Sequence, residues 1–497
     1  MEELGKPTVV SEMSSGSEAR GLSNRHAAEG GGLARSTGEA GQRPWREGAG
    51  QGSLPDGSNT AAPEADKAVY TKLGGLVERA QKEVKLTNVI QYLDEELLHL
   101  AFKSLRKQAA PGIDGQSYAE YAERLEENIQ GLHGRLKSGR YRAPAVRRAY
   151  IAKATGGRRP LGISTVEDRM VQKAVAWLLS AVFEQDFLEC SHGFRPRRSA
   201  HTALKRLREG ILRGRMRYVV EVDIRSYFDT VNREWLRRFV RHRANDGGLI
   251  RLLGKWLKAG VLEDGMISHP SAGVPQGGPV SPVLANIYLH YVLDQWFEWR
   301  FKRSCRGAAE LTRYADDFVA AFSYREDAER FRREVEERLK AFGLQVAPEK
   351  TAIRRFDGDL SGGGVSRDER PESFSFLGFS HYLTKTRRGK LNVGRKPSVK
   401  ARERFLLAVR SWLRGHLHWR VWEQQERLRQ MLEGFYQYFG LTLCVRTLNG
   451  IRWRVRKLWR AALLRRSQRA GRRCTWGQLA NKRWFQLPAG RVTKASV

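Results

Sequence analysis

The chain has 497 residues, 41% of them hydrophobic and 29% charged. This length exceeds what one ordinary hydrophobic core holds and indicates about two to four domains. Its formal net charge of +35 is hard to explain without a polyanionic partner, and nucleic acid is the first candidate. No apolar run approaches the roughly 18 residues of a membrane span. The four cysteines form no C-x-x-C pair, which excludes a zinc ribbon and a disulfide framework. We therefore expect a protein of a reducing cytosol with no membrane partner.

The first part of the chain divides into a tail and a helical region. Residues 1–66 are rich in Gly, Ala, Ser and Glu and hold ten acids against six bases, so we predict a disordered N-terminal tail. From Val69 apolar residues recur at helical spacing, and residues 118–137 predict a further amphipathic helix. The next expected elements are a β-hairpin and two helices, at residues 148–163, 165–188 and 199–213.

The middle of the chain alternates strands and helices. Residues 218–224 form an apolar run that predicts a buried strand with Asp223 at its C-terminal end. Residues 311–322 predict two short strands with Asp316 and Asp317 at the turn between them. Two helices and a last strand are expected at residues 281–301, 326–342 and 344–355. The resulting β-α-β-β-α-β order is the split βαβ arrangement, which places the chain in the α+β class.

The last part of the chain, from about Arg395, is predicted to be helical and is strongly basic. Between Arg395 and Val497 there are 25 Lys plus Arg and 4 Glu, a net charge of +21 out of the whole chain's +35. Aromatic residues alternate with arginines here, a pattern that suits stacking on bases and pairing with phosphates. For most single aromatic residues in this region a place in the helix core is the stronger interpretation.

Asp223, Asp316 and Asp317 are the candidate catalytic residues. A template-directed polymerase joins a 3′-hydroxyl to an α-phosphate and needs two divalent ions about 3.5–4 Å apart. Mg²⁺ takes hard oxygen ligands, usually one or two carboxylates plus phosphate. Carboxylates at the ends of neighbouring strands meet that need, whereas an isolated Asp-Asp pair is more often a solvated turn. Apolar runs flank this pair, so its charges would lie beside a core unless a cation compensates them.

Eight short motifs occur in an order typical of reverse transcriptases. VDIRSYFD at 222–229 and YADD at 314–317 resemble the first palm motif and the second catalytic motif of that family. GVPQGGPVSP at 273–282 is similar to the nucleotide-binding motif of its group II intron branch. The other motifs are GIDG at 112–115, RPLGI at 159–163, SHGFRP at 191–196, PEKT at 348–351 and FLGF at 376–379. Together they identify the chain as similar to group II intron-encoded reverse transcriptases, or maturases, over about residues 70–470.

This resemblance implies a right-hand polymerase with fingers, a ferredoxin-like palm and a helical thumb. The expected parts are the disordered N-terminal tail at 1–66, an N-terminal extension and fingers at 67–215, the palm at 216–394, the thumb or maturase X domain at 395–450, and a basic DNA-binding tail at 451–497. No endonuclease domain is expected, because only Cys474 and no histidine lie in the last segment.

The resemblance also implies roles for residues around the three aspartates. Asp223, Asp316 and Asp317, with the backbone carbonyl of Ile224, would hold two Mg²⁺ ions, with Mn²⁺ as a substitute. Five residues are expected to bind the nucleotide: Lys153, Arg159, Phe228, Gln276 and Lys350. The alternatives are that Arg158 replaces Arg159, that Phe228 is an ordinary core residue, that Gln276 is a turn residue, and that Lys350 is simply solvated.

Two further groups are expected to hold the nucleic acid. Leu377 and Gly378 lie in the motif that resembles the primer grip. The basic residues expected to bind nucleic acid are Arg410, Arg414, Arg420, Arg452, Arg454, Arg456 and Lys457. A solvated charged face remains the alternative for the last four.

The function implied is an RNA-directed DNA polymerase and maturase that binds a group II intron RNA, assists its splicing and copies it into DNA during mobility. The partners would be that RNA, a DNA target, a primer–template and dNTPs. The resemblance places the protein in a ribonucleoprotein of the bacterial cytoplasm, and a homodimer is left open. Two alternatives remain: a splicing-only RNA-binding maturase, and an intron-independent bacterial reverse transcriptase for defence, hypervariation or repair.

Overall fold

The computed structural model describes residues that all belong to one compact unit, 54–497. The described residues are 64–152, 158–263, 266–268, 273, 277–358, 371–466 and 474–494. The expected disordered tail lies outside them, except for its last three residues, which begin helix α1 (Glu64–Lys72).

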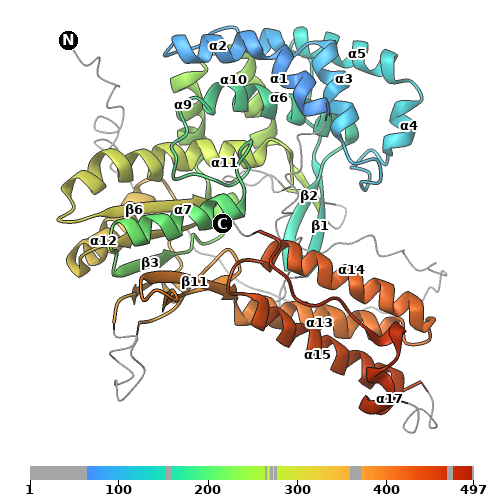
Figure 1. The fold of residues 1–497 in the computed structure, drawn as a ribbon. Helices are drawn as coiled ribbons and strands as arrows, with labels where there is room; N and C mark the ends of the chain where they lie inside the picture. Colours follow the sequence, from blue (N-terminus) through green and yellow to red (C-terminus); the bar gives the residue numbers. More distant parts are fainter. Residues whose placement is uncertain are drawn as a thin grey trace, which may run out of the picture. The chain divides into compact units, whose positions relative to one another are not determined.

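Helix α6 (Val166–Phe183) forms the centre of the N-terminal helical region (Figure 1). It is buried on most of its surface because its sequence is apolar almost throughout. The surrounding helices are α2 (Gly74–Lys82), α3 (Glu95–Ser104), α4 (Tyr118–Ala122), α5 (Leu125–Lys137), α9 (Arg233–Arg243) and α10 (Gly247–Lys258).

The single helix expected at 118–137 is wrong, because the chain breaks between α4 and α5. Arg124 has φ −125° and ψ 45°, which is not helical. The side-chain amide of Asn128 donates to the carbonyl of Tyr121 at 3.0 Å, so a side chain from α5 satisfies a carbonyl at the end of α4.

A four-stranded sheet contains the predicted hairpin. Strands β1 (Val146–Ala152) and β2 (Arg158–Ile163) pair antiparallel as expected. The strand order is β2-β1-β4-β5, and β1 pairs parallel with β4 (Val261–Glu263), which continues antiparallel into β5 (Met266–Ser268). The sequence analysis did not predict β4 and β5, which are only three residues each.

A second four-stranded sheet contains the strands of the predicted split βαβ unit. Its strands are β3 (Tyr218–Val222), β6 (Ala309–Tyr314), β7 (Asp317–Phe322) and β8 (Ala352–Arg355). They lie in the order β6-β7-β3-β8, and all adjacent pairs are antiparallel. The predicted strand order along the chain is confirmed.

The last strand of this sheet is shorter than expected. Residues 344–355 were predicted as one strand, but β8 covers only its end. Val346 forms an isolated bridge with Ile224, and a 3-10 turn at Pro348–Lys350 follows. Proline fixes φ and has no N–H to donate, so a continuous ladder cannot pass this point.

The two faces of this sheet belong to different cores. Val220 and Val222 point into the larger core, together with residues of α11 (Ser281–Leu289) and α12 (Arg325–Ala341). Val219, which precedes Val220 and points to the opposite face, belongs to the other core with α7 (Ala200–Arg213). Because side chains alternate along a strand, Glu221 and Asp223 lie on this second face together with Val219.

The helix predicted at 281–301 is continuous but irregular. After α11, two segments have π-helical hydrogen bonding, His290–Asp294 and Phe297–Phe301. The N–H of Gln295 donates to the carbonyl of His290, five residues earlier. Among the described residues, no helix combines the length and the hydrophobicity needed to cross a lipid bilayer.

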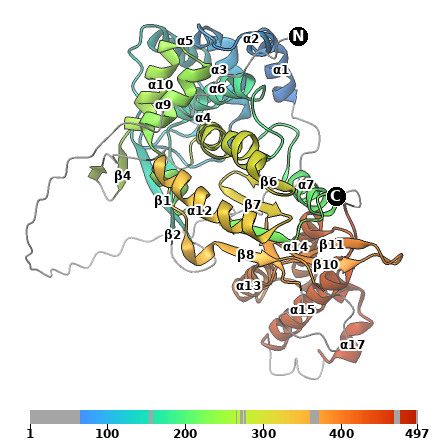
Figure 2. The same ribbon diagram turned by 90° about the vertical axis from the view of Figure 1, so that its left-hand side faces the viewer.

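The C-terminal part consists of a small sheet and three long helices (Figures 1 and 2). The sheet order is β11-β10-β9, with β9 (Phe374–Phe376), β10 (Phe379–Lys385) and β11 (Leu391–Pro397). The helices are α13 (Val399–Gly415), α14 (Val421–Phe439) and α15 (Val445–Leu464), followed by the short α17 (Trp476–Ala480). The expected helical start at Arg395 is wrong, because this residue lies in β11 and the Ser398 side chain caps the first helix.

Candidate active site

The three aspartates lie at one end of the second sheet. Val222 of β3 pairs with Phe318 of β7, so one further step along this register places Asp223 opposite Asp317. Residues opposite each other in an antiparallel pair present their side chains on the same face. Asp316 lies in the two-residue turn before β7. The fold therefore brings all three predicted residues to one place.

Negative charge accumulates at this end of the sheet. The pKa of Asp317 is raised to about 7 by desolvation among the surrounding protein atoms and by the charges of Asp316, Asp223 and Glu221. The side chain nevertheless keeps some exposed surface. The backbone N–H of Leu377 donates to this carboxylate and opposes the rise. This is the environment expected of carboxylates that share a cation.

A lysine side chain pairs with one of the three aspartates. The Lys350 ammonium lies 2.6 Å from the Asp223 carboxylate, and both side chains are more than a third exposed. Among the described residues, no three carboxylate, histidine or cysteine side chains lie close enough together to hold a metal ion in their present positions. The aspartates are thus close enough to interact electrostatically, and Asp223 is paired with a cationic side chain.

A fully buried arginine fixes the turn that carries the aspartates. Both Arg313 and Asp294 have no exposed side-chain surface, and their ion pair has an N–O distance of 2.5 Å. The Arg313 guanidinium also donates to Asn286 at 2.9 Å, to the Ala315 carbonyl at 2.9 Å and to the Ser191 hydroxyl at 2.8 Å. All five of its N–H groups are used in these bonds. Since Ala315 has a φ of +57°, the bond to its carbonyl stabilises an unusual backbone conformation.

The segment around SHGFRP packs directly behind the same turn. The N–H of His192 donates to the carbonyl of Arg313 at 2.9 Å, and Ser191 forms a parallel bridge with that residue. A Cβ atom on Gly193 would lie 2.3 Å from the backbone nitrogen of Ala315, so only glycine fits there. Two distant stretches of sequence therefore fix one turn.

The sequence analysis missed Arg313, Asp294 and Asn286. The available signal was an arginine in the predicted strand, directly before YADD, together with an aspartate inside an apolar helix. Buried charges are rare unless they are paired, so the two residues could have been proposed as partners.

The glycines on either side of Gln276 pack tightly against other parts of the chain. A Cβ atom on Gly273 would come within 2.8 Å of the carbonyl of Phe228, and one on Gly277 within 2.7 Å of the carbonyl of Gly162 in β2. Gly278 is equally tight against the Gln172 side chain of α6. The glycines thus allow the chain on either side of Gln276 to approach both the strand turn after Asp223 and the hairpin.

The expected nucleotide-binding residues are only partly described. Phe228 is half-buried beside Tyr227, with ring centroids 5.4 Å apart. Lys153 and Gln276 lie outside the described residues, and of Arg159 only the backbone is described, paired with Ile151.

Leu377 and Gly378 form the tight turn between β9 and β10. Their φ values are +50° and +77°, as in the turns that join two-residue hairpins. Besides the N–H of Leu377 at Asp317, the carbonyl of Leu377 accepts a hydrogen bond from the Tyr438 hydroxyl at 2.9 Å. The predicted primer-grip turn therefore connects the aspartates to helix α14.

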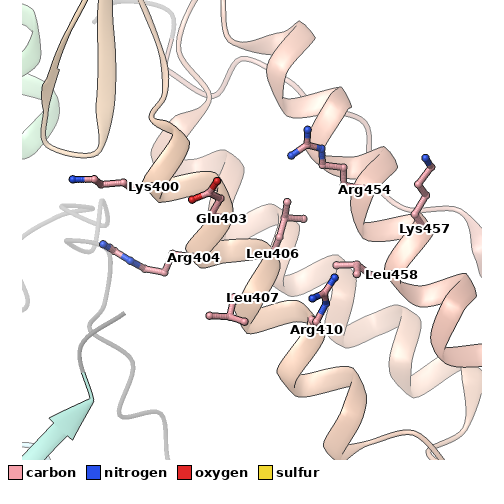
Figure 3. A pocket seen from close by; sticks show the side chains of 9 residues that line it. All are labelled: Lys400, Glu403, Arg404, Leu406, Leu407, Arg410, Arg454, Lys457 and Leu458. Atoms are coloured by element: carbon pink, nitrogen blue, oxygen red, sulfur yellow. The ribbon is translucent and has the colours of Figure 1, made fainter. Parts of the chain in front are cut away.

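A furrow between α13 and α15 is lined by exposed lysine and arginine side chains (Figure 3). One cavity of about 650 Å³ and a second of about 310 Å³ share Arg410 and Leu458, so they form a continuous depression. The floor of this furrow is aliphatic. Its basic residues are Lys400, Arg404, Arg410, Arg414, Arg454, Lys457 and Arg465, against the single acid Glu403.

The expected nucleic-acid-binding residues separate into two groups. Arg410, Arg414, Arg454 and Lys457 line the furrow. Arg456 instead lies over the ring of Phe485 at 5.0 Å, and the Nε atoms of Arg452 and Arg456 are buried. Arg420 is exposed at the N-cap of α14.

Most aromatic residues of these helices are core residues, as expected. Phe435, Tyr436 and Phe439 are buried. Trp419, Trp422 and Trp453 are about half exposed, and the Lys457 ammonium lies 3.5 Å above the ring of Trp453.

A family model described as reverse transcriptase (RNA-dependent DNA polymerase) matches residues 151–381. This range includes the hairpin, the three aspartates and the turn at Leu377 and Gly378.

The curated relatives agree with this match. The chain is 38% identical over 243 residues to Protein YkfC of Escherichia coli, covering 42% of this chain and 62% of that protein. It is 43% identical over 166 residues to the group II intron-encoded protein LtrA of Lactococcus lactis, covering 33% of this chain and 27% of LtrA. It is 39% identical over 247 residues to a 91 kDa protein in the cob intron of Schizosaccharomyces pombe, covering 47% of this chain and 29% of that protein. In each case the chain spans less than two thirds of the relative's own length.

Proposed function

We propose, on the premise that the chain belongs to the reverse transcriptase family of group II intron-encoded proteins, that it is an RNA-directed DNA polymerase. The observation that carries this proposal is the gathering of Asp223, Asp316 and Asp317 at one end of a β6-β7-β3-β8 sheet. Three carboxylates that raise one another's pKa suit the binding of divalent cations.

In this proposal the described elements form a right-hand polymerase. The β6-β7-β3-β8 sheet belongs to the palm, 216–394, and its strand order along the chain is that of a split βαβ unit. The hairpin β1–β2 belongs to the N-terminal extension and fingers, 67–215. Helices α13 and α14 belong to the thumb, 395–450, and most of α15 to the basic DNA-binding tail, 451–497.

The three aspartates and the Ile224 carbonyl would hold two Mg²⁺ ions. Ile224 forms an isolated bridge with Val346, and the hydrogen bonds of this bridge are made by its two neighbours, the carbonyl of Asp223 and the N–H of Arg225. The carbonyl of Ile224 therefore points to the opposite side of the strand, toward β7. Bound there, the ions would supply charge stabilisation for the attacking and leaving oxygens.

The protein's own groups would select and orient the substrates. Phe228 would crowd a ribose 2′-hydroxyl and so favour dNTPs, and Gln276 would contact the sugar. Lys153 and Arg159 would hold the triphosphate, because cationic donors suit phosphate oxygens. Lys350 is paired with Asp223, and we propose that its ammonium group would leave that carboxylate and bind the leaving pyrophosphate. Leu377 and Gly378 would align the primer strand.

Primer extension on a primed RNA template tests the polymerase. Asp316→Ala should abolish DNA synthesis, because it removes a carboxylate from the ion-binding group. The matched control is Glu329→Ala, an exposed acid on α12 that is paired with Arg325, on the opposite face of the sheet. Normal extension by Asp316→Ala, or equal losses in both variants, would reject the site.

A maturase function is the second proposal, and the basic furrow between α13 and α15 favours it. Splicing assistance needs binding energy that favours the folded intron RNA over its alternatives, which a positive surface supplies without the aspartates. Asp223→Asn should therefore lose extension but keep binding to the cognate group II intron RNA. Neutralising Arg410 and Arg414 should weaken RNA binding and splicing first.

A paired assay of primer extension and intron splicing separates these activities. If Asp223→Asn loses both while it remains folded, or if the wild type binds its cognate intron no better than a scrambled RNA at the same salt, the maturase proposal fails. The polymerase proposal would then stand alone.

A further inference from the structure

Phe194 has an unusual combination of exposure and backbone conformation. Its side chain is 55% exposed, although burying a phenyl ring is favourable. Its φ is +56°, a left-handed conformation that a bulky residue adopts only at an energetic cost. Neither property benefits the folded state by itself. Strain of this kind persists where the surrounding structure imposes it, and it concentrates at functional positions.

The residues on both sides of Phe194 impose this conformation. The carbonyl of Gly193 accepts a hydrogen bond from the Asn286 side chain at 2.7 Å, and this glycine fits tightly against Ala315. On the other side Arg195 is nearly buried and donates to the carbonyls of Leu188 at 2.7 Å and Ser191 at 2.9 Å. The chain is thus fixed before and after Phe194, and the ring between them is left outside.

The exposed ring lies beside the aspartates. The ring centroids of Phe194 and Tyr314 are 6.4 Å apart. Tyr314 pairs directly with Asp317 across the β6–β7 turn, so the two side chains share one face of the sheet. Phe194 therefore extends an aromatic surface from Tyr314 at the edge strand of the sheet, next to the site where the proposed chemistry occurs.

We propose that Phe194 contacts a nucleotide of the primer–template duplex next to the primer's 3′ end, with its ring against the base. This inference rests on the proposed polymerase function and assigns a positioning role to a residue of the SHGFRP motif, for which the sequence predicted no role. An exposed aromatic ring held in a fixed orientation suits stacking or apolar contact with a nucleotide. Tyr314 and the buried Arg313 beneath it keep this surface in register with Asp316 and Asp317.

The test compares duplex affinity with thermal stability for Phe194→Ala and Phe194→Gly. Both should raise the Kd for a fluorescent primer–template about tenfold or more, measured without dNTP. Phe194→Gly should keep or raise the Tm, because glycine adopts a positive φ without strain. A residue with a purely structural role would lower the Tm together with affinity. The matched control is Tyr324→Ala, an aromatic that is 41% exposed and lies beyond the far end of β7, roughly 20 Å from Asp317.

Abasic sugars placed in turn near the primer end, in the template or in the primer, identify the contacted strand. At the contacted position, the wild type and Phe194→Ala should bind the modified duplex about equally. The inference is overturned if Phe194→Ala binds the duplex as tightly as the wild type, even if the ring proves to bind a protein partner. It is also overturned if the loss of affinity is accompanied by a fall in Tm. Because affinity is measured without catalysis, this outcome is distinct from extension by Asp316→Ala, which would reject the polymerase itself.

Discussion

The turn that carries the aspartates and the furrow between α13 and α15 show two different ways of using charge. At the turn, one arginine has no exposed side-chain surface and is held by five hydrogen bonds to four residues. In the furrow, seven basic residues line an open depression with one acid. Four of them, Arg410, Arg414, Arg454 and Lys457, form no ion pair within the described residues.

This difference predicts how each region responds to substitution. A buried network fails as a unit, because removal of one member leaves the others desolvated and unpaired. Solvated charges along a furrow act nearly independently, so each substitution should remove a small and similar share of binding. Precise chemistry therefore depends on a few residues of the sheet, whereas affinity is distributed over the helices.

The largest expected effect is that of Asp317→Asn. Extension should fall on the order of a thousandfold, because charge stabilisation by bound ions is lost. The Tm should rise at neutral pH, since one of several mutually repelling carboxylates is removed. Parallel measurement of extension and thermal unfolding checks both. A lower Tm would mean that Asp317 supports the fold, and the distinction between chemical and structural residues at the turn would be lost.

Arg313→Met should reduce folding stability by about 3–5 kcal/mol, because it leaves the Asp294 carboxylate buried without a partner. Adding Asp294→Leu should restore much of this stability but not activity, since the bond to the Ala315 carbonyl stays absent. Chemical denaturation and primer extension on both variants provide the measurement. Full activity in the double variant would show that the ion pair does not position the turn.

Replacing Arg410, Arg414 and Arg454 together by glutamine should leave stability nearly unchanged. The log–log slope of affinity against salt should fall by about 2–3, so a fourfold rise in salt should cost the variant roughly 20- to 40-fold less affinity than the wild type. Arg429→Gln is the control, because Arg429 is already paired with Glu426 and Glu433 on α14. An equal change in the control would show that the furrow has no special role.

The smallest expected effect is that of Phe228→Val. Trimming the half-buried ring beside Tyr227 should relax discrimination against ribonucleotides by about tenfold while dNTP incorporation continues. Single-nucleotide incorporation kinetics with dNTP and rNTP pairs give the ratio. An unchanged ratio would identify Phe228 as a core residue of the α8 turn (Tyr227–Thr230).

The position of the aspartates could be predicted from the sequence because it follows from local patterns. An apolar strand ending at Asp223 and a strand–turn–strand around Asp316 and Asp317 are readable from alternation and turn composition. Their approach to one another follows from the order of strands in a split βαβ unit.

The partners of Arg313 could not be predicted in the same way. Its hydrogen-bonding groups come from positions 19, 27 and 122 residues distant in sequence, and no local periodicity reports such contacts. The strands β10 and β11 were not predicted either, and Arg395 near the end of β11 was assigned to the basic helical region that follows. The division between Arg454 and Arg456 likewise depends on which face of α15 meets Phe485.

The π-helical segments after α11 make the effect of a deletion depend on where it falls. A π turn holds about one more residue than an α turn, and each residue of an α-helix advances by about 100°. Deleting one residue between Leu289 and Asp294 would let the π segment become α-helical and would leave Asp294 near its present orientation. Deleting one residue of α11 between Asn286 and Leu289 would instead rotate Asp294 by about 100° relative to Asn286, and the two residues could no longer both bond Arg313. The regular part of this helix therefore fixes the spacing of the groups that hold the turn with YADD, and the π segment is where a change of one residue should be tolerated.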